Sequence, residues 1–237
     1  MFIKNKQMKN KLIDYWRKEN RLYDTYPNYC HYSTQLVFNK YFKNIKKKKI
    51  LDIGCGHGAM MEFFKKKGAI VKGVDISPEA VSYSMSRGLD VIQADCRKLP
   101  LPDNSFDIVF SLGVVEHFDE TIQAIKEHLR VCKPDGKAVI IVPHYNSLSY
   151  FGAVLWKHIR WGLKYDMMTA IGKAYTKNRF RKILIKAGCK NIKILTYFGS
   201  APFKVLTGKL NKRLAYSIEN SWYGKNFGHL LLGISTK

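Results

Sequence analysis

The chain has 237 residues, 46% of them apolar and 13% aromatic, so it can bury a core without disulfides or metals. No apolar run approaches the roughly 18 residues of a membrane-spanning helix, so a standard transmembrane helix is not expected. The five cysteines are widely spaced and form no Cys-x-x-Cys pair, so neither a metal site nor a disulfide framework is expected. A reducing cytoplasm fits this cysteine pattern.

The charge is strongly positive and unevenly distributed. Lysine and arginine number 41 against 18 acidic residues, for a net charge of +23. Residues 1–49 carry a net +10, residues 50–135 a net −3, and residues 136–237 a net +16. Basic flanks around an acidic centre would attract polyanions, anionic membranes or acidic substrates. The plainer interpretation is a lysine-rich solvated surface with no dedicated partner.

Strands and helices are expected to alternate after an aromatic-rich, helical segment over residues 1–45. Short apolar runs predict buried strands at Ile50–Ile53, Ile70–Asp75, Val91–Ala94, Phe106–Ser111 and Lys137–Val142, with late strands at Asn191–Thr196 and Phe227–Ser235. Helical patterns fall at Ala59–Lys67, from the Ser77-Pro78-Glu79 start to Gly88, and at Glu120–Val131, and Pro134–Gly136 reads as a turn. This alternation predicts an α/β fold with a mostly parallel sheet and helices on both faces.

A glycine-rich turn joins the first strand to the first following helix. The sequence from Asp52 to Gly58 is Asp-Ile-Gly-Cys-Gly-His-Gly, typical of a loop that lets a nucleotide cofactor approach the backbone. It admits two interpretations, because Gly54-x-Gly56-x-x-Ala59 also satisfies a dinucleotide fingerprint. Asp75, which is 21 residues after Gly54, would suit a ribose diol in either case.

Three carboxylates favour a cationic nucleoside over a dinucleotide. Asp52 stands at the mouth of the first strand, where it would repel a pyrophosphate but attract an ammonium group. Asp75 and Asp95 stand at the ends of the next two strands, and Asp95 is placed to meet an adenine amino group. A single such aspartate would be read as a loop cap.

Five ordered motifs resemble the class I S-adenosylmethionine-dependent methyltransferases, especially the branch that methylates small molecules and lipids such as quinone precursors. The resemblance runs from about Lys49 to Val142, and more weakly to the C-terminus. The motifs are Ile50–Gly58, Gly73–Ser77, Asp95-x-x-x-Leu99-Pro100 with Ser105–Val109, Val115–Phe118, and Leu129–Gly136. It implies a Rossmann-like seven-stranded sheet whose last strand is antiparallel, and S-adenosylmethionine as the cofactor.

The resemblance also implies cofactor-binding roles. Asp52 and the turn through Gly54, Cys55, Gly56 and Gly58 would hold the methionine moiety. Asp75 would bind the ribose and Ile76 would pack on the adenine. The remaining implied positions are Asp95 and Cys96 at the adenine edge, and Ser111, Leu112 and Val115 beneath the sulfonium.

Methyl transfer needs a base only when the acceptor must lose a proton. The candidates are His117, His144 and Tyr145, because all three follow the fourth or fifth strand, where ligands of open sheets bind. His31 and Tyr32 could close over the cofactor, whereas His57 is read as a loop residue.

The segment 143–186 is longer than one crossover helix needs, and we call it the lid insertion. Apolar residues recur at helical spacing from Leu148 to Leu163, with Lys157, Arg160 and Lys164 on another face and tryptophans between. This pattern fits a lid over the acceptor, an amphipathic helix at an anionic membrane surface, or both. Another basic cluster, Lys209–Arg213, follows later in the chain.

One methyltransferase domain is therefore expected over residues 1–237. It divides into an N-terminal helical segment (1–45), a cofactor-binding core (46–142), the lid insertion (143–186) and C-terminal strands (187–237). The expected acceptor is a small or lipid-like molecule, and the enzyme would be cytoplasmic or peripheral at a membrane. RNA methylation and a catalytically silent cofactor-binding partner are the alternatives. RNA is less favoured, because the sequence has no recognisable RNA-binding module.

Overall fold

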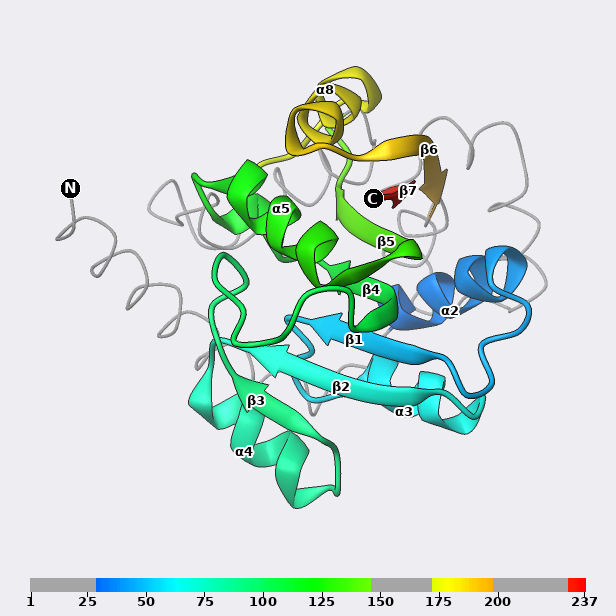
Figure 1. The fold of residues 1–237 in the computed structure, drawn as a ribbon, viewed down its shortest axis with the longest axis vertical. Helices are drawn as coiled ribbons and strands as arrows, with labels where there is room; N and C mark the ends of the chain where they lie inside the picture. The colour runs from blue at the N-terminus through cyan, green and yellow to red at the C-terminus, as the bar shows by residue number, and fades with distance from the viewer. Residues whose placement is uncertain (1–28, 146–171, 198–229) are drawn as a thin grey trace, which may run out of the picture.

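The computed structural model describes residues 29–145, 172–197 and 230–237 (Figure 1). In these ranges helices and strands alternate as the sequence predicts. The helices are α2 (Tyr29–Tyr41), α3 (Ala59–Lys66), α4 (Pro78–Ser86), the short 3₁₀ helix η1 (Val115–His117), α5 (Thr121–Val131) and α8 (Lys177–Ala187). The strands are β1 (Lys49–Ile53), β2 (Ile70–Asp75), β3 (Val91–Gln93), β4 (Phe106–Leu112), β5 (Cys132–Pro143), β6 (Lys190–Tyr197) and β7 (Leu230–Thr236).

The strands form one seven-stranded sheet in the order β3-β2-β1-β4-β5-β7-β6. The pairs among β1 to β5 are parallel, and β7 runs antiparallel to both of its neighbours. This confirms the predicted Rossmann-like fold with an inserted, antiparallel last strand. The strands that precede helices therefore end at one edge, which we call the carboxyl edge, and begin at the opposite amino edge.

Helices cover both faces of the sheet, as expected. Alternating strand residues point to opposite faces, so the fully buried neighbours Ile50 and Leu51 belong to two different apolar clusters. One cluster joins the sheet to α2, α3 and α4 through Phe38, Met61, Phe64 and Val81. The other joins it to α5 and α8 through Ile125, Leu129, Phe180 and Leu184.

Local signals explain where two helices begin. At α4, Ser77 Oγ accepts a hydrogen bond from the backbone N–H of Ala80 at 3.2 Å, with Pro78 at the first helical position. At α8, Thr176 Oγ1 accepts from the N–H of Arg179 at 3.2 Å, and Gly188 ends the helix at a φ of 97°. The Ser77 start is confirmed.

The turn predicted at Pro134–Gly136 is instead part of strand β5. Its pairing with β4 begins at Cys132 opposite Phe106 and resumes at Lys137 opposite Ile108, so the intervening residues form a bulge. A Cβ on Gly136 would lie 2.6 Å from Cys132 Sγ and 2.9 Å from the carbonyl oxygen of Asp107. The turn prediction was wrong because strand pairing starts before these residues, and glycine lets the bulge pack against β4.

Several predicted segments lie outside the described residues. These are the helical pattern before residue 29, residues 146–171 of the lid insertion with Lys157, Arg160 and Lys164, the cluster Lys209–Arg213, and the side chains of His31 and Tyr32. The two described ends of the lid insertion lie together, because Tyr145 N–H donates to the Tyr175 carbonyl at 2.9 Å and Tyr175 N–H donates to that of Pro143 at 3.0 Å. In the described part of the chain, no helix is both long and apolar enough to cross a membrane.

Candidate active site

The glycine-rich turn lies at the carboxyl edge, between β1 and α3. The N–H groups of Gly54 and Cys55 both donate to the Val74 carbonyl, at 2.7 and 3.1 Å, which fastens the turn to β2. Gly56 has a φ of +51°, and no atom lies within 4 Å of the place where its Cβ would be. The backbone at Gly56 therefore faces open space that a ligand can enter.

Asp75, at the end of β2, is held by this turn. Its Oδ2 accepts from Gly56 N–H at 2.8 Å and its Oδ1 accepts from Ser77 N–H at 2.9 Å. Burial raises the pKa of Asp75, and these backbone hydrogen bonds act in the opposite direction. The carboxylate is thus fixed in orientation beside the open face of the turn.

Asp52 is a buried carboxyl without a donor. It is 3% exposed, and no described residue gives it a hydrogen bond. Burial, together with the nearby charge of Asp75, raises the pKa of Asp52 well above its usual value. A cation bound beside Asp52 would favour the ionised carboxylate and so oppose both effects, which is why Asp52 fits a positively charged ligand group.

Asp95 is already engaged by a residue that the sequence prediction missed. Arg97 Nε donates to Asp95 Oδ1 at 3.0 Å and Arg97 Nη2 to Oδ2 at 2.7 Å, while Nη1 reaches Glu120 at 2.8 Å. The guanidinium also lies 4.8 Å from the ring centre of Phe118. An adenine amino group at Asp95 would share this carboxylate with Arg97. The close spacing of Asp95 and Arg97 was the available signal.

The other predicted cofactor residues surround the same edge, and several of their side chains point elsewhere. A Cβ on Gly73 would lie 2.8 Å from Cys55 Sγ, so the Cys55 thiol packs against β2. Cys96 is buried in the core, and burial raises the pKa of both thiols. The Ser111 hydroxyl bonds with His128 Nε2 at 2.9 Å. Ile76, Leu112 and Val115 lie at or just past the ends of β2 and β4, and Gly58 begins α3.

The predicted catalytic candidates occupy different environments. His144 is 2% exposed, and its backbone forms an isolated parallel β-bridge with Tyr175. Tyr145 is 48% exposed. His117 lies on η1. Its neighbour Glu116, which the sequence prediction did not single out, is 2% exposed. Burial raises the pKa of Glu116 to about 8, partly offset by hydrogen bonds from its own backbone and that of Val114.

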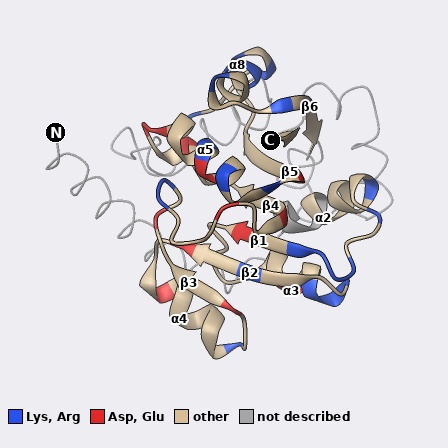
Figure 2. Ribbon diagram, in the orientation of Figure 1, with Lys and Arg blue, Asp and Glu red and all other residues tan. Residues whose placement is uncertain are grey.

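Charge separates the two edges of the sheet. Figure 2 shows acidic residues at the ends of β1 and β2, and basic residues in the loop before β1 and at the end of α3. The lysines at 46–49 and 65–67 are exposed. The ends of β1 and β2 therefore suit a cationic ligand group, while the exposed lysines before β1 and at the end of α3 would attract an anionic one.

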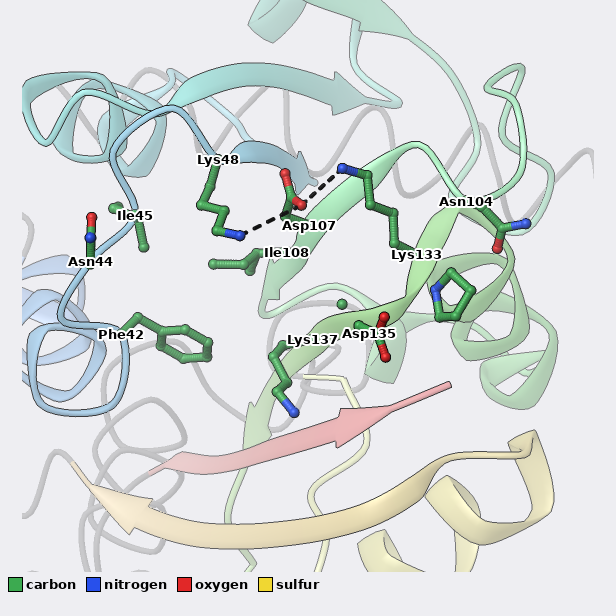
Figure 3. Close-up of a pocket in the computed structure, with 12 residues that line it drawn as sticks. Phe42, Asn44, Ile45, Lys48, Asn104, Asp107, Ile108, Lys133, Asp135 and Lys137 are labelled. Atoms are coloured by element: carbon green, nitrogen blue, oxygen red, sulfur yellow. Dashed lines mark hydrogen bonds and ion pairs between the residues drawn. The ribbon is translucent and has the colours of Figure 1, made fainter.

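The amino edge also has a cavity of about 570 Å³, lined by residues of the loop before β1 and of the starts of β4 and β5 (Figure 3). At its wall, Asp107 accepts from Lys133 Nζ at 2.9 Å and from the N–H of Lys49 at 2.8 Å, and Lys48 Nζ lies 3.9 Å away. Because these contacts join the starts of β1, β4 and β5, we interpret this cavity as structural. Among the described residues, no group of three His, Cys, Asp or Glu side chains could hold a metal ion.

Comparison with known proteins assigns this geometry to a family. Residues 51–140, which hold the turn and all three aspartates, match the family model for a methyltransferase domain. Over these residues the chain matches a methyltransferase domain. This methyltransferase domain contains every cofactor-binding position that the sequence predicted, although the matches do not test the individual residues.

Relatives of the methyltransferase domain act on dissimilar acceptors. The chain is 31% identical over 120 residues to a ubiquinone biosynthesis O-methyltransferase of Pseudomonas fluorescens, covering 47% of this chain and 51% of the relative. It is 38% identical over 96 residues to a probable tRNA methyltransferase 9B of Bos taurus, covering 39% and 21%. The chain thus spans about half, or less, of these curated relatives.

A solved structure supports the fold. A SAM-dependent methyltransferase from Thermotoga maritima superposes with a TM-score of 0.62 at 18% identity, covering 86% of this chain and 87% of that one. At this level of identity the match is evidence for the Rossmann-like fold alone.

Proposed function

We propose that the whole protein transfers a methyl group from S-adenosylmethionine to a small-molecule or lipid-like acceptor. The observation that carries the cofactor assignment is Asp52, a buried carboxyl without a donor beside the open face of the glycine turn. S-adenosylmethionine has an ammonium and a sulfonium, so it would supply the missing positive charge. A dinucleotide would instead bring a pyrophosphate toward Asp52 and Asp75.

The residues of the site would bind and orient rather than react. Asp75, held by Gly56 and Ser77, offers fixed acceptor oxygens to ribose hydroxyls. The turn provides a backbone surface without side chains at Gly56. When bound, the cofactor supplies a methyl group already activated on sulfur. The protein then mainly has to align the acceptor for in-line attack, and positioning can provide much of the rate enhancement.

A small or lipid-like acceptor is favoured by the similarity to a quinone-pathway enzyme and by the amphipathic pattern of the lid insertion. RNA is the second candidate, favoured by the exposed lysines of the amino edge and by the tRNA methyltransferase relative. A nucleic acid could contact both edges of the sheet, because a flexible polymer can extend around the domain.

The test uses purified full-length protein and S-adenosylmethionine labelled on the methyl group. Calorimetry should detect binding of S-adenosylmethionine but not of NADH, and tighter NADH binding would overturn the cofactor assignment. The loaded protein is then incubated with lipid, RNA and small-molecule fractions of a cell extract. Label in the lipid or small-molecule fraction supports the proposal, and label confined to RNA favours the second candidate. Binding without transfer to any fraction indicates a silent partner protein.

A further inference from the structure

Glu116 carries a buried oxygen that has no hydrogen-bond partner. The residue is 2% exposed on η1, and its Oε2 is inaccessible to solvent and receives no donor. Such an unsatisfied group costs about 1–3 kcal/mol, so it calls for an explanation in a folded protein.

The rest of Glu116 is held firmly in place. Gly172 packs on its stem so closely that a Cβ there would lie 2.5 Å from Glu116 Cγ, and Gly172 has a φ of +68°. The N–H of Lys173 donates to the Glu116 carbonyl at 3.1 Å. The unsatisfied oxygen therefore belongs to a residue fixed by both its stem and its backbone.

Glu116 stands between the cofactor turn and the described ends of the lid insertion. On one side Val114 touches the turn, since a Cβ on Gly54 would lie 2.3 Å from Val114 Cγ2. On the other side are Gly172 and the buried Tyr175, whose pKa is raised by burial and, to a smaller extent, by the charge of Glu116. With the cofactor bound at the turn, an acceptor would have to approach from this carboxyl edge, where ligands of open sheets bind.

Two basic side chains of the carboxyl edge are held by other groups in the described chain. Lys173 Nζ donates to the Phe118 carbonyl at 3.0 Å and to Asp119 at 2.8 Å. Arg97 is held by Asp95 and Glu120. The partner of Glu116 is thus expected to come from a ligand.

The charge of the carboxyl edge indicates which kind of ligand fits. Asp52, Asp75 and Asp95 end three neighbouring strands or their loops, and Asp119 and Glu120 follow η1. An anionic acceptor group would be repelled by these carboxylates, whereas an N–H or O–H donor would be attracted.

We propose that Glu116 is the acceptor-binding residue of this methyltransferase, and that its free oxygen accepts a hydrogen bond from an N–H or O–H group of the acceptor. This inference rests on the proposed function and narrows it: the acceptor presents a neutral or cationic donor at this position, and not a carboxylate or phosphate.

The test uses four ring compounds of similar size: phenol, benzylamine, benzoate and toluene. Their binding to the protein saturated with S-adenosylhomocysteine is measured by ligand-detected NMR at pH 9, where Glu116, whose pKa is about 8, is ionised, with EDTA present to remove metal ions. We expect phenol or benzylamine to bind at least 10-fold more tightly than toluene, and benzoate no more tightly than toluene. Glu116→Gln should reduce that preference about 10-fold.

Asp90→Asn is the control, because it removes an exposed carboxylate, 63% exposed, that pairs with Lys72 at the opposite edge of the sheet, and it should keep the preference. The proposal is overturned if benzoate or toluene binds as well as the donor probes, if no probe binds, or if Glu116→Gln behaves like wild type. S-adenosylhomocysteine affinity and thermal melting are measured for each variant. Failure of the wild type to bind S-adenosylhomocysteine rejects the proposed function itself, whereas normal binding without donor preference rejects only the role of Glu116.

Discussion

The backbone N–H of Gly56 donates to Oδ2 of Asp75 at 2.8 Å, and so ties the turn after β1 to the end of β2. The same carboxylate that would bind the cofactor therefore also shapes the loop around it. A substitution at Asp75 should therefore change both cofactor binding and the conformation of the turn.

Asp75→Asn should weaken S-adenosylmethionine binding by about 10-fold or more. An amide has one acceptor oxygen, so one of the N–H groups of Gly56 and Ser77 would face an NH₂ group instead of an acceptor. A 10-fold loss corresponds to about 1.4 kcal/mol and is measurable by calorimetry. Asp90→Asn, on an exposed aspartate paired with Lys72, is the control and should bind normally. Equal affinity in the two variants would count against a ribose-binding role for Asp75.

Asp52→Asn should weaken cofactor binding at least 10-fold without weakening the fold. Burial and the charge of Asp75 both disfavour the ionised form of Asp52, so its pKa is raised. A raised pKa means that the folded protein loses stability as the pH rises toward that pKa, and the amide removes this loss. Urea unfolding at pH 8 without cofactor should show the variant to be at least as stable as wild type. A variant that binds the cofactor normally would place Asp52 outside the site.

Gly56→Ala and Gly88→Ala form a matched pair. Both glycines have a positive φ, +51° and +72°, and neither has an atom within 4 Å of the position of a Cβ. Alanine in the left-handed region should cost both variants a similar 1–2 kcal/mol or so of unfolding free energy. Only Gly56→Ala places a methyl group on the open face of the turn, so only it should lose cofactor affinity, by about 10-fold or more in calorimetry. Equal affinities would show that the ligand does not approach Gly56.

His128 should make the protein sensitive to acid. Its Nδ1 lies 2.8 Å from the Ala124 carbonyl and its Nε2 lies 2.9 Å from Ser111 Oγ, and burial lowers its pKa to about 4. Between about pH 6.5 and pH 4 the unfolded chain binds the proton and the folded protein does not. The unfolding free energy should therefore fall as the pH falls through this window, by up to roughly 3 kcal/mol at about 1.4 kcal/mol per unit.

The comparison that isolates this effect is urea unfolding of wild type, His128→Gln and His57→Gln at pH 7 and pH 5. His128→Gln should lose most of the acid-dependent change, and His57→Gln, altered at a half-buried loop histidine, should keep it. Parallel pH dependence in all three proteins would mean that other groups cause the acid sensitivity.

Local signals predicted most strands, the glycine-rich turn and the starts of α3, α4 and α5, whereas the early start of β5 and the helix α8 were not predicted. The apolar run before the glycine turn gave β1 within one residue, and the Ser77-Pro78 start of α4 is as expected, because both depend on neighbours in sequence. The bulge at Gly136 was missed because it depends on where β4 pairs, which sequence spacing does not reveal.

The sequence predicted those site residues that stand at the ends of strands. It did not predict the interactions between residues that are brought together only by folding. Asp52 and Asp75 were found from their positions beside the turn. The saturation of Asp95 by Arg97 and the burial of Glu116 under Gly172 were not, because burial and pairing depend on segments brought together by folding. The bond between Thr34 and Tyr197, at 2.8 Å and 163 residues apart, shows the same limit.

Two hydrogen bonds join Tyr175 to Pro143 and Tyr145 at the carboxyl edge, and they hold the two described ends of the lid insertion side by side. Chain that departs after Tyr145 and returns at Gly172 leaves and re-enters at one place, so its length and composition can change without altering the register of the sheet. We therefore expect residues 146–171 to be exchangeable without disturbing the sheet or α8. Replacing residues 146–171 with the corresponding loop of another methyltransferase should transfer acceptor preference while the carboxylates that hold the methyl donor remain in position.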